Sequence, residues 1–518
     1  MMKGLLKRLL GAGIGVALMG LAAMPASAEQ DVFVIAKAQD PTSLDPAFTM
    51  TNNDWTITYP AYQRLVRYGV KDGVGQTSVE GELAKSWEAS EDGKTWTFTL
   101  VDGQAFDDGT PVDAAAVKFS FDRLKAMGNG PADAFPTLES VEVIDPKTVR
   151  FHLAEPFAPF LYTLANNGAA IVNPAIASHE KDGDHAQGWL SSHTAGSGAF
   201  RLVSWDKGQS IVLEPNPHYG GEAPAFSKVV VKMIGEASTR RLQLVNGDVD
   251  LAEELPIDQL DAIANEDGVV VKEYPSFRIT QFYLNTSKPP LDDPDVRRAI
   301  NHAIDYQGII DGILLGKGIQ MRGPIPKGMW GHDETVLQYD YDLDKAKELI
   351  AGKDIGTLTY LYASTDPNWE PIGLLLQASL AQLGIELKME NLAYATMREH
   401  IDKGDFNIAA GNWTPDFSDP YMFMNYWFDS AKFGLAGNRS FYKNEKVDEL
   451  IRTAARLTSQ EERTKLYQQA QEIVVNDAVY AYLFQRNENI AMREDVKGFV
   501  FNPMLVQIYN LADMSKSE

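Results

Sequence analysis

The sequence has no cysteine among its 518 residues, so neither disulfides nor cysteine-ligated metal sites can form. Stability must come from a hydrophobic core, which a chain with 44% hydrophobic residues can build over about two or three domains. An excess of basic charge is also absent, because 47 Lys and Arg stand against 71 Asp and Glu, a net charge of −24. This acidity disfavours nucleic acid and anionic membranes as partners, since phosphate binding needs clustered Lys and Arg. Solubility explains it most simply, and attraction of cationic solutes is the alternative.

The signatures of common catalytic sites are absent as well. The eight histidines show neither HExxH nor zinc-type spacing. There is no G-x-S-x-G motif, because Ala195 occupies the first glycine position before Ser197. His185 and His193 are the histidines nearest to a metal-binding pattern, but loop histidines far more often have a structural role. We therefore expect a protein that is not an enzyme and that has no metal site and no cofactor.

The N-terminal residues have the layout of a secretory signal. Lys3, Lys7 and Arg8 are followed by an apolar run over 9–21 and by the small residues Ala-Ser-Ala at 26–28. The apolar run is too short and too rich in glycine for a good membrane span. Cleavage after that triplet would release the chain into a periplasm, and without cysteine it would not be a lipoprotein.

The segment 81–124 combines turn, strand and helix signals in a distinctive order. Asp92-Gly93 is a hairpin-type turn before the alternating, β-branched segment 95–100. After a second polar turn, Asp113 is a good N-cap for an amphipathic helix.

This segment resembles the signature region of family 5 extracellular solute-binding proteins, the peptide/nickel class that serves ABC importers. Those proteins carry a pattern like SWE-x-S-x-DG-x-x-x-x-F-x-L-x-DG-x-x-F-x-DG-TP-x-x-A-x-x-V-x-x-S. The residues that match it are Ser86, Trp87, Glu88, Asp92, Gly93, Asp102, Gly103, Phe106, Asp108, Gly109, Thr110, Pro111, Ala115 or Ala116, Val117 and Ser120. A match of this length implies a protein that binds and delivers a solute and does not transform it.

The resemblance also implies a fold and a division of the chain. The fold is α/β, a two-lobe periplasmic-binding-protein fold of type II and of the large peptide-binding class, with an extra subdomain inserted in the first lobe. The expected parts are the signal peptide 1–28, lobe I over 29–275 with the subdomain at about 70–193, lobe II over 276–487, and a return to lobe I over 488–518.

Two further regions locate the expected ligand cleft. The loop 41–46 is similar to the family's P-x-x-L-D-P loop, which with the following helix lines part of the cleft. Asn53 and Trp55 are therefore candidate ligand contacts. Family-like blocks meet at a lobe boundary expected near 272–282, which makes Phe277 another candidate.

A glycine-rich stretch resembles the family's GTGPY block, with Ser197 in place of Thr, Ala199 in place of Pro and Phe200 in place of Tyr. Gly196 and Gly198 allow the main chain to approach a ligand or another segment closely. We favour a structural turn over a ligand contact.

Several local elements can be predicted from spacing alone. Aromatic residues recur at helical spacing over 51–68. Asp293 should cap a helix on which Arg297 and Arg298 make surface pairs. The run 458–461 reads as a capping box, with Thr and Glu at its ends, for a helix that follows.

The best candidate for ligand recognition follows a strand expected at 406–411. Ligands of α/β proteins bind at the carboxyl ends of strands. Trp413, Asp416 and Pro420 match a W-x-x-D-x-x-x-P pattern of the family's peptide-binding members, in which the Asp pairs with the peptide α-ammonium. Trp413 would offer a flat apolar face, and Asp419 is expected to be a helix N-cap or a turn residue and not a second ligand carboxylate. The alternative is that Asp416 only caps a turn. The weaker candidates in this stretch are Phe417 and Tyr421.

The resulting hypothesis is a monomeric periplasmic protein that holds a short peptide between two lobes and delivers it to an inner-membrane ABC permease. A non-peptide solute such as an oligosaccharide, an opine or a metal chelate is the first alternative. A secreted peptide hydrolase or a chaperone-like protein is the second.

Overall fold

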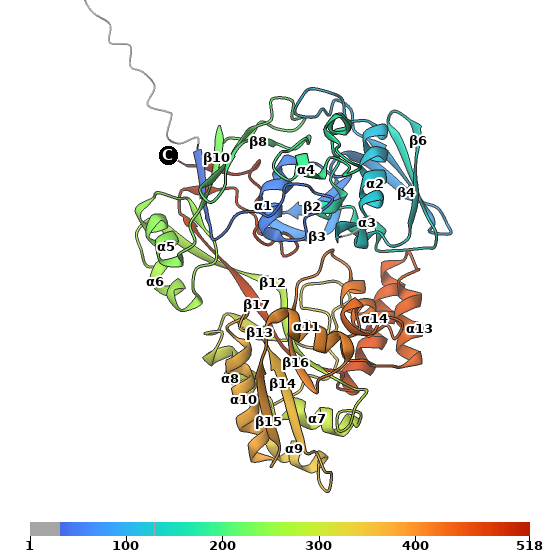
Figure 1. Cartoon of the computed structure of the whole chain (residues 1–518), viewed down its shortest axis with the longest axis vertical. Coiled ribbons are helices and arrows are strands. Elements are labelled where there is room, and N and C mark those ends of the chain that lie inside the picture. Colours follow the sequence, from blue (N-terminus) through green and yellow to red (C-terminus); the bar gives the residue numbers. More distant parts are fainter. Residues whose placement is uncertain (1–31, 129, 518) are drawn as a thin grey trace, which may run out of the picture.

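The computed structural model describes residues 32–128 and 130–517, so the predicted signal peptide lies outside the described residues. Two lobes are joined by two long strands, β12 (Val269–Leu284) and β17 (Tyr480–Arg493). The upper lobe in Figure 1 contains the blue and cyan N-terminal part, and the lower lobe contains the yellow and orange part. The expected two-lobe α/β arrangement is present.

One mixed sheet of eleven strands runs through both lobes, in the order β15-β14-β16-β12-β17-β11-β1-β10-β9-β8, with β13 paired to β17. Its other strands are β1 (Val32–Lys37), β8 (Phe200–Asp206), β9 (Ser210–Pro215), β10 (Lys228–Met233), β11 (Leu251–Ala252), β13 (Gly318–Gln320), β14 (Thr357–Tyr362), β15 (Glu386–Asn391) and β16 (Ile408–Trp413). Strands β1, β10 and β11 are parallel neighbours in lobe I, as are β14, β15 and β16 in lobe II.

The expected lobe boundary lies inside a continuous strand. The strands β12 and β17 pair antiparallel on both sides of the crossing, and their register shifts between Pro275 and Ile279. The two predicted division points lie opposite each other, because Pro275 pairs with Asn487. At the crossing, Gln485 donates hydrogen bonds from Nε2 to the carbonyls of Ser276 (2.7 Å) and Lys327 (2.9 Å). The division into lobes at these positions remains our proposal.

Lobe I carries a separate antiparallel sheet, β4-β5-β7-β6, with α2 (Ala114–Met127) packed on β6 and β7. Its strands are β4 (Ala84–Ala89), β5 (Thr95–Leu100), β6 (Leu138–Asp145) and β7 (Thr148–Leu153). The predicted N-cap is confirmed, because Asp113 accepts a hydrogen bond from the Ala116 amide at 2.9 Å. The helix is joined to the sheet by aromatic contacts. The ring centre of Phe151 in β7 lies 4.9 Å from that of Phe121 in α2 and 5.5 Å from that of Phe98 in β5.

The remaining elements complete both lobes. Two small sheets pair β2 (Val66–Lys71) with β3 (Val74–Gly81) and β18 (Val496–Lys497) with β19 (Ser515–Lys516). The other helices are α1 (Asn52–Ala61), α3 (Phe160–Thr163), α4 (Gln187–Leu190), α5 (Ala237–Asn246), α6 (Leu260–Ile263), α7 (Pro294–His302), α8 (Tyr306–Gly312), α9 (Leu343–Leu349), α10 (Trp369–Gln382), α11 (Tyr394–Lys403), α12 (Asn425–Phe428), α13 (Glu445–Ala454) and α14 (Gln460–Asn476).

Two helix boundaries differ from those that the sequence indicated. The helical spacing over 51–68 continues only to the end of α1, because Tyr62 is extended (φ −126°, ψ 149°). The Tyr62 hydroxyl instead accepts a hydrogen bond from the Ala195 amide (3.1 Å), which ties the chain after α1 to the glycine-rich stretch. Helix α14 is capped by Ser459, which accepts from the Glu462 amide at 3.4 Å, so the cap lies one residue after the predicted Thr458.

Arg297 has a different role from the predicted surface pairing. The side chain is only 4% exposed and donates to the carbonyls of Asp477 (2.6 Å) and Leu291 (2.8 Å). It therefore joins the start of α7 to the end of α14, and a buried guanidinium satisfied by carbonyl oxygens is a structural tie. Arg298 does make the expected surface pair, with Asp295 at 2.8 Å.

The glycine-rich stretch packs against the end of α1. A Cβ on Gly198 would lie 2.3 Å from the carbonyl oxygen of Pro60, and one on Gly196 would lie 2.1 Å from that of Ala61. Neither glycine has a left-handed φ, so close approach is the reason for glycine here. The structural interpretation of this stretch is thereby supported.

We expect Gly198→Ala to lower the free energy of unfolding by about 1–3 kcal/mol, the usual cost of overpacking. Gly312→Ala is the matched control, because nothing lies within 4 Å of its Cβ position. Urea denaturation of the two variants checks the prediction. Equal free energies of unfolding for the two variants would show that the backbone at the end of α1 can shift to make room for the added methyl group without loss of stability.

Candidate ligand-binding cleft

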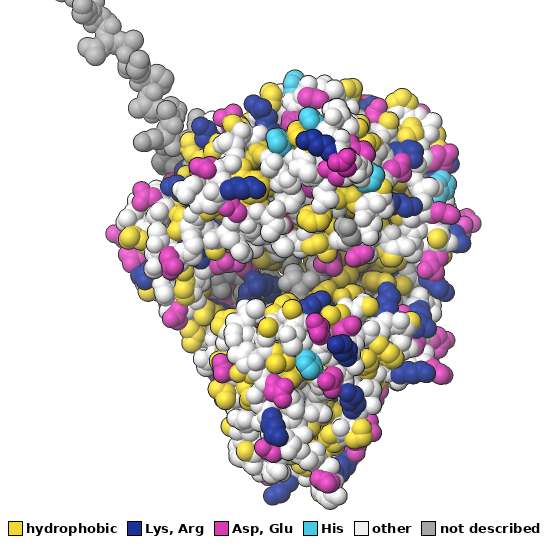
Figure 2. All heavy atoms as spheres, in the orientation of Figure 1, with side chains coloured by type: hydrophobic (Ala, Val, Ile, Leu, Met, Phe, Trp, Pro, Cys, Tyr) yellow, Lys and Arg dark blue, Asp and Glu magenta, His cyan; other side chains and the backbone are white. Residues whose placement is uncertain are grey.

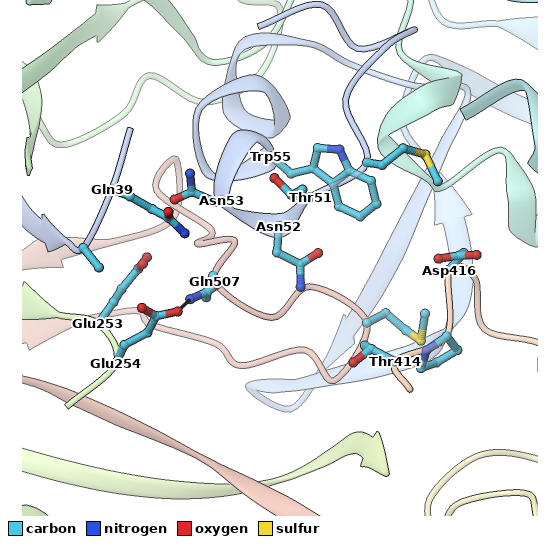
Figure 3. A pocket seen from close by; sticks show the side chains of 14 residues that line it. Gln39, Thr51, Asn52, Asn53, Trp55, Glu253, Glu254, Thr414, Asp416 and Gln507 are labelled. Carbon is cyan, nitrogen blue, oxygen red and sulfur yellow. Dashed lines mark hydrogen bonds between the residues drawn. The ribbon is translucent and has the colours of Figure 1, made fainter. Parts of the chain in front are cut away.

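The surface is hollowed between the two lobes (Figure 2). A cavity of about 350 Å³ lies there, and we call it the central cavity. Lobe I contributes the start of α1 and the residues after β11, and lobe II contributes the loop after β16. The polar and aromatic side chains that line it include Asn52, Asn53, Trp55, Glu253, Glu254, Asp416 and Gln507 (Figure 3). Both lobes therefore supply groups to one site.

Asp416 faces this cavity from the loop that follows β16. Among the described residues, no cation lies within ion-pair distance of its carboxylate, and its backbone carbonyl accepts a hydrogen bond from Asn166 at 2.8 Å. Burial, with a smaller contribution from Asp133, raises the pKa of Asp416 to about 6. An unpaired carboxylate with a raised pKa in a cleft is the arrangement that a cationic ligand group stabilises.

Asn53 and Trp55 lie in the same cavity, as part of α1. Asn53 donates to the carbonyl of Asp40 (2.8 Å), and the Trp55 indole donates to Thr49 Oγ1 (3.1 Å). Trp55 is only 9% exposed, so it forms a fixed wall. The structure thus brings together three of the predicted residues, Asn53, Trp55 and Asp416, in one cavity. Their contact with a ligand remains a prediction.

Two acidic residues that we did not predict also line the central cavity. Glu253 pairs with buried Lys37 (2.6 Å) and accepts from the Tyr509 hydroxyl (2.6 Å). The Glu254 carboxylate accepts from the side-chain amide of Gln507 (3.1 Å), and among the described residues no cation lies within 4.0 Å of it. Both follow the two-residue strand β11, which is too short to leave a clear periodic signal. The uncompensated charge of this cavity is therefore negative.

Trp413 lies in an adjoining pocket of about 230 Å³ that contains four arginines, Arg278, Arg398, Arg439 and Arg486. We call it the arginine pocket. Thr414 lines both this pocket and the central cavity, so the two are neighbours. The Trp413 ring stacks on Tyr426 at 4.9 Å and meets Trp427 edge-on at 5.2 Å. Its position is set by these rings.

The other three predicted contacts are absent from the lining of both spaces. Phe417 is 3% exposed and stacks on Tyr421, which itself packs edge-on against Phe157 at 5.3 Å. Phe277 is also 3% exposed and lies against Gly328. These aromatic side chains are therefore packing residues in the described structure.

A buried ion pair fixes the loop that carries Asp416. Asp419 accepts from the amide of Tyr421 (2.9 Å), which confirms the predicted N-cap, and both of its oxygens pair with Arg463 (2.7 and 2.8 Å). The Arg463 guanidinium lies over the Trp330 ring at 4.9 Å, and the Trp330 indole donates to the carbonyl of Ser418 (3.2 Å). The loop is therefore held by α14 and by its neighbours.

Of the two histidines nearest to a metal-binding pattern, His193 makes a ring contact with Trp189, and His185 accepts a hydrogen bond from Arg123 Nε through its backbone carbonyl at 2.8 Å. The Trp189 ring stacks between His179 (4.3 Å) and His193 (4.5 Å). Within 32–128 and 130–517 no group of three or more His, Cys, Asp or Glu side chains is placed to hold a metal ion. In the same ranges no helix combines the length and apolarity needed to cross a membrane.

Comparison with known proteins identifies the family of the chain. Residues 78–434 match the model of the bacterial extracellular solute-binding proteins, family 5. The chain is 58% identical to the probable D,D-dipeptide-binding periplasmic protein DdpA of Escherichia coli, over 95% of each chain. It is 29% identical to the dipeptide-binding protein of the same organism, over 95% of this chain and 96% of the other.

A solved structure extends the likeness to the fold. The periplasmic binding protein DppA of Helicobacter pylori, in complex with the peptide STSA, superimposes with a TM-score of 0.78 at 29% identity, over 94% of this chain and 98% of the other. The predicted family and the predicted two-lobe fold are confirmed by these matches.

Proposed function

Because the chain belongs to the bacterial extracellular solute-binding proteins of family 5, we propose that it captures a short peptide between its lobes. In this proposal the Asp416 carboxylate holds the α-ammonium group of the peptide. The observation that carries it is the unpaired Asp416 carboxylate, with its pKa raised to about 6, in the cavity between the lobes. A charge-assisted hydrogen bond to an ammonium compensates such a carboxylate.

The proposed ligand is a D,D-dipeptide. The relative at 58% identity is named as a probable D,D-dipeptide-binding protein. The central cavity, at about 350 Å³, is at the small end of the range for ligand pockets, which favours a ligand of about two residues.

The cellular role follows from the same proposal. The protein would act as a monomer in the periplasm, after cleavage of the segment 1–28 and without a lipid anchor, and would deliver its ligand to an inner-membrane ABC permease. The relative at 58% identity is named as a periplasmic protein, and both relatives from Escherichia coli are named as binding proteins. We propose accordingly that the chain binds its solute without converting it.

The test combines two measurements. Native mass spectrometry of the protein purified from cells should show a retained mass of dipeptide size. Calorimetry should show tighter binding of D-alanyl-D-alanine than of L-alanyl-L-alanine. A retained oligosaccharide, opine or metal chelate would overturn the peptide proposal, and cleavage of peptides at catalytic rates would overturn the binding role.

A further inference from the structure

Lobe I contains a cavity of about 500 Å³, which is larger than the central cavity. It lies between the end of α1, the hairpin of β2 and β3, the glycine-rich stretch before β8 and the C-terminal segment 498–513. We call it the lobe I cavity. Among the described residues, none of those that line it also lines the central cavity or the arginine pocket. It is therefore a separate space, for which the proposed peptide site does not account.

Aromatic and aliphatic side chains make up much of the lining of this cavity. Five tyrosines come from the end of α1, the segment after it, β2 and two later parts of the chain, namely Tyr59, Tyr62, Tyr68, Tyr219 and Tyr509. The aliphatic residues include Val70, Val500, Leu505, Ile508 and Leu511. Ring faces pack well against other rings, and a volume of this size is typical of small-molecule sites. The lining thus favours a compact molecule that contains a ring.

The charged groups at the cavity are largely paired with one another. Arg64 pairs with Glu82 at 3.1 Å, and both side chains are almost buried (2% and 11% exposed). Arg67 pairs with Glu80 at 2.9 Å on the exposed surface of the hairpin. Asp513 also lines the cavity, but it is exposed, so water screens its charge. A charged ligand would lose hydration without gaining a free buried counter-charge among the described residues, so the cavity favours a neutral ligand.

The polar groups of the lining differ in whether they have partners within the protein. The Tyr509 hydroxyl donates to Glu253 at 2.6 Å, and the Asn502 amide donates to a backbone carbonyl at 3.0 Å. In contrast, the buried Tyr59 hydroxyl and the buried Gln63 Oε1 have no hydrogen-bond partner among the described residues. A ligand hydroxyl offers both the acceptor and the donor that these two groups lack.

We propose that the lobe I cavity is a second ligand site, which binds a neutral molecule with an aromatic or alicyclic ring and at least one hydroxyl group. The tyrosine rings and aliphatic side chains would contact the body of this molecule, and the closed ion pairs would disfavour ions. The proposal goes beyond the proposed peptide function and does not rest on it.

The first test uses benzyl alcohol, a neutral ring compound with one hydroxyl group, as the probe in an NMR titration. Val70 lines the cavity and is 49% exposed, so Val70→Trp should fill part of the space without disturbing the core. We expect the unmodified protein to bind the probe and Val70→Trp to bind it at least about tenfold more weakly. Val74→Trp is the matched control, because Val74 belongs to the same hairpin, is 60% exposed and is not among the lining residues. Failure of the unmodified protein to bind, or equal weakening in both variants, would overturn the proposal.

A second blocking variant and a competition experiment locate the probe. Ala512→Phe, in the C-terminal segment, should cause the same loss of affinity as Val70→Trp. Unchanged affinity in both blocking variants would reject the site. Saturating D-alanyl-D-alanine should leave the probe bound, and displacement by the dipeptide would also overturn the proposal. If the probe binds in the lobe I cavity but no dipeptide binds the protein, the second site stands and the proposed function fails.

The third test concerns the charge of the ligand. Benzoate and benzylammonium share the ring of benzyl alcohol but carry opposite charges. We expect each ion to bind the lobe I cavity at least about tenfold more weakly than the alcohol, where binding to this cavity is the part that Val70→Trp removes. An ion that binds there as tightly as the alcohol would contradict the inferred ligand class.

Discussion

Replacing Arg463 by alanine should lower the free energy of unfolding by about 3–5 kcal/mol. The guanidinium is 3% exposed and makes two short contacts with Asp419, whose side chain is fully buried. Its removal leaves a carboxylate without a counter-charge in the interior of lobe II, and that desolvated charge is the source of the cost. Urea denaturation of the purified variant gives the value.

Arg456→Ala is the matched control for this prediction. Its ion pair with Glu155 is exposed on both sides (61% and 57%), so its loss should change stability by at most about 1 kcal/mol. The double variant Arg463→Met/Asp419→Asn should recover part of the loss, because it contains no unpaired buried charge. Similar stabilities for Arg463→Ala and Arg456→Ala would show that the buried pair does not hold the loop of Asp416.

Asp416→Asn should weaken the binding of D-alanyl-D-alanine by about 1.5–3 kcal/mol, or roughly 10- to 150-fold. Asparagine keeps the shape of the side chain but removes the negative charge that faces the ligand ammonium. Calorimetry with the two proteins measures the difference. Asp113→Asn is a suitable control, since that carboxylate caps α2, which packs on the separate four-stranded sheet of lobe I, and should leave affinity unchanged. An unchanged affinity for Asp416→Asn would reject this residue as the anchor.

The same anchor predicts a pH dependence. Because burial raises the pKa of Asp416 to about 6, the carboxylate of the free protein is ionised above that value and protonated below it. The ammonium group of the ligand binds the ionised form of Asp416. The affinity for the dipeptide should therefore be at its maximum above about pH 7 and should fall by up to about tenfold per pH unit below pH 6. The ligand ammonium and carboxylate keep their charges between about pH 4.5 and 7, so the change belongs to the protein. Asp416→Asn should show no such slope.

Local patterns predicted the elements that depend on neighbours in the sequence. Asp113 caps α2, and Asp92-Gly93 joins β4 to β5, because a cap or a tight turn is decided by a few adjacent residues. Asp416 and Trp55 reach the cleft because their motifs lie at the end of a strand and at the start of a helix. The cap of α14 was missed by one residue, since Thr458 and Ser459 offer the same chemistry.

Long-range contacts were out of reach of such patterns. The arginine pocket draws on β12, α11, β17 and a loop, and none of these segments marks its arginine as a pocket residue. Arg297 has the spacing of a surface residue. In the folded chain, however, its side chain is buried and donates hydrogen bonds to a carbonyl group at the end of α14, which is far away in the sequence. Phe277, Phe417 and Tyr421 have the aromatic character of ligand contacts, but they pack in the interior and do not line either space.

The most direct measurement compares D-alanyl-D-alanine with its N-acetyl derivative, by calorimetry on the unmodified protein at pH 7.5. Acetylation removes the ammonium charge and leaves the carboxylate in place. The account predicts one-to-one binding of the free dipeptide and a loss of at least about tenfold on acetylation, as a charged hydrogen bond to Asp416 requires. Equal binding of the two compounds would contradict the capture of a peptide through its amino terminus.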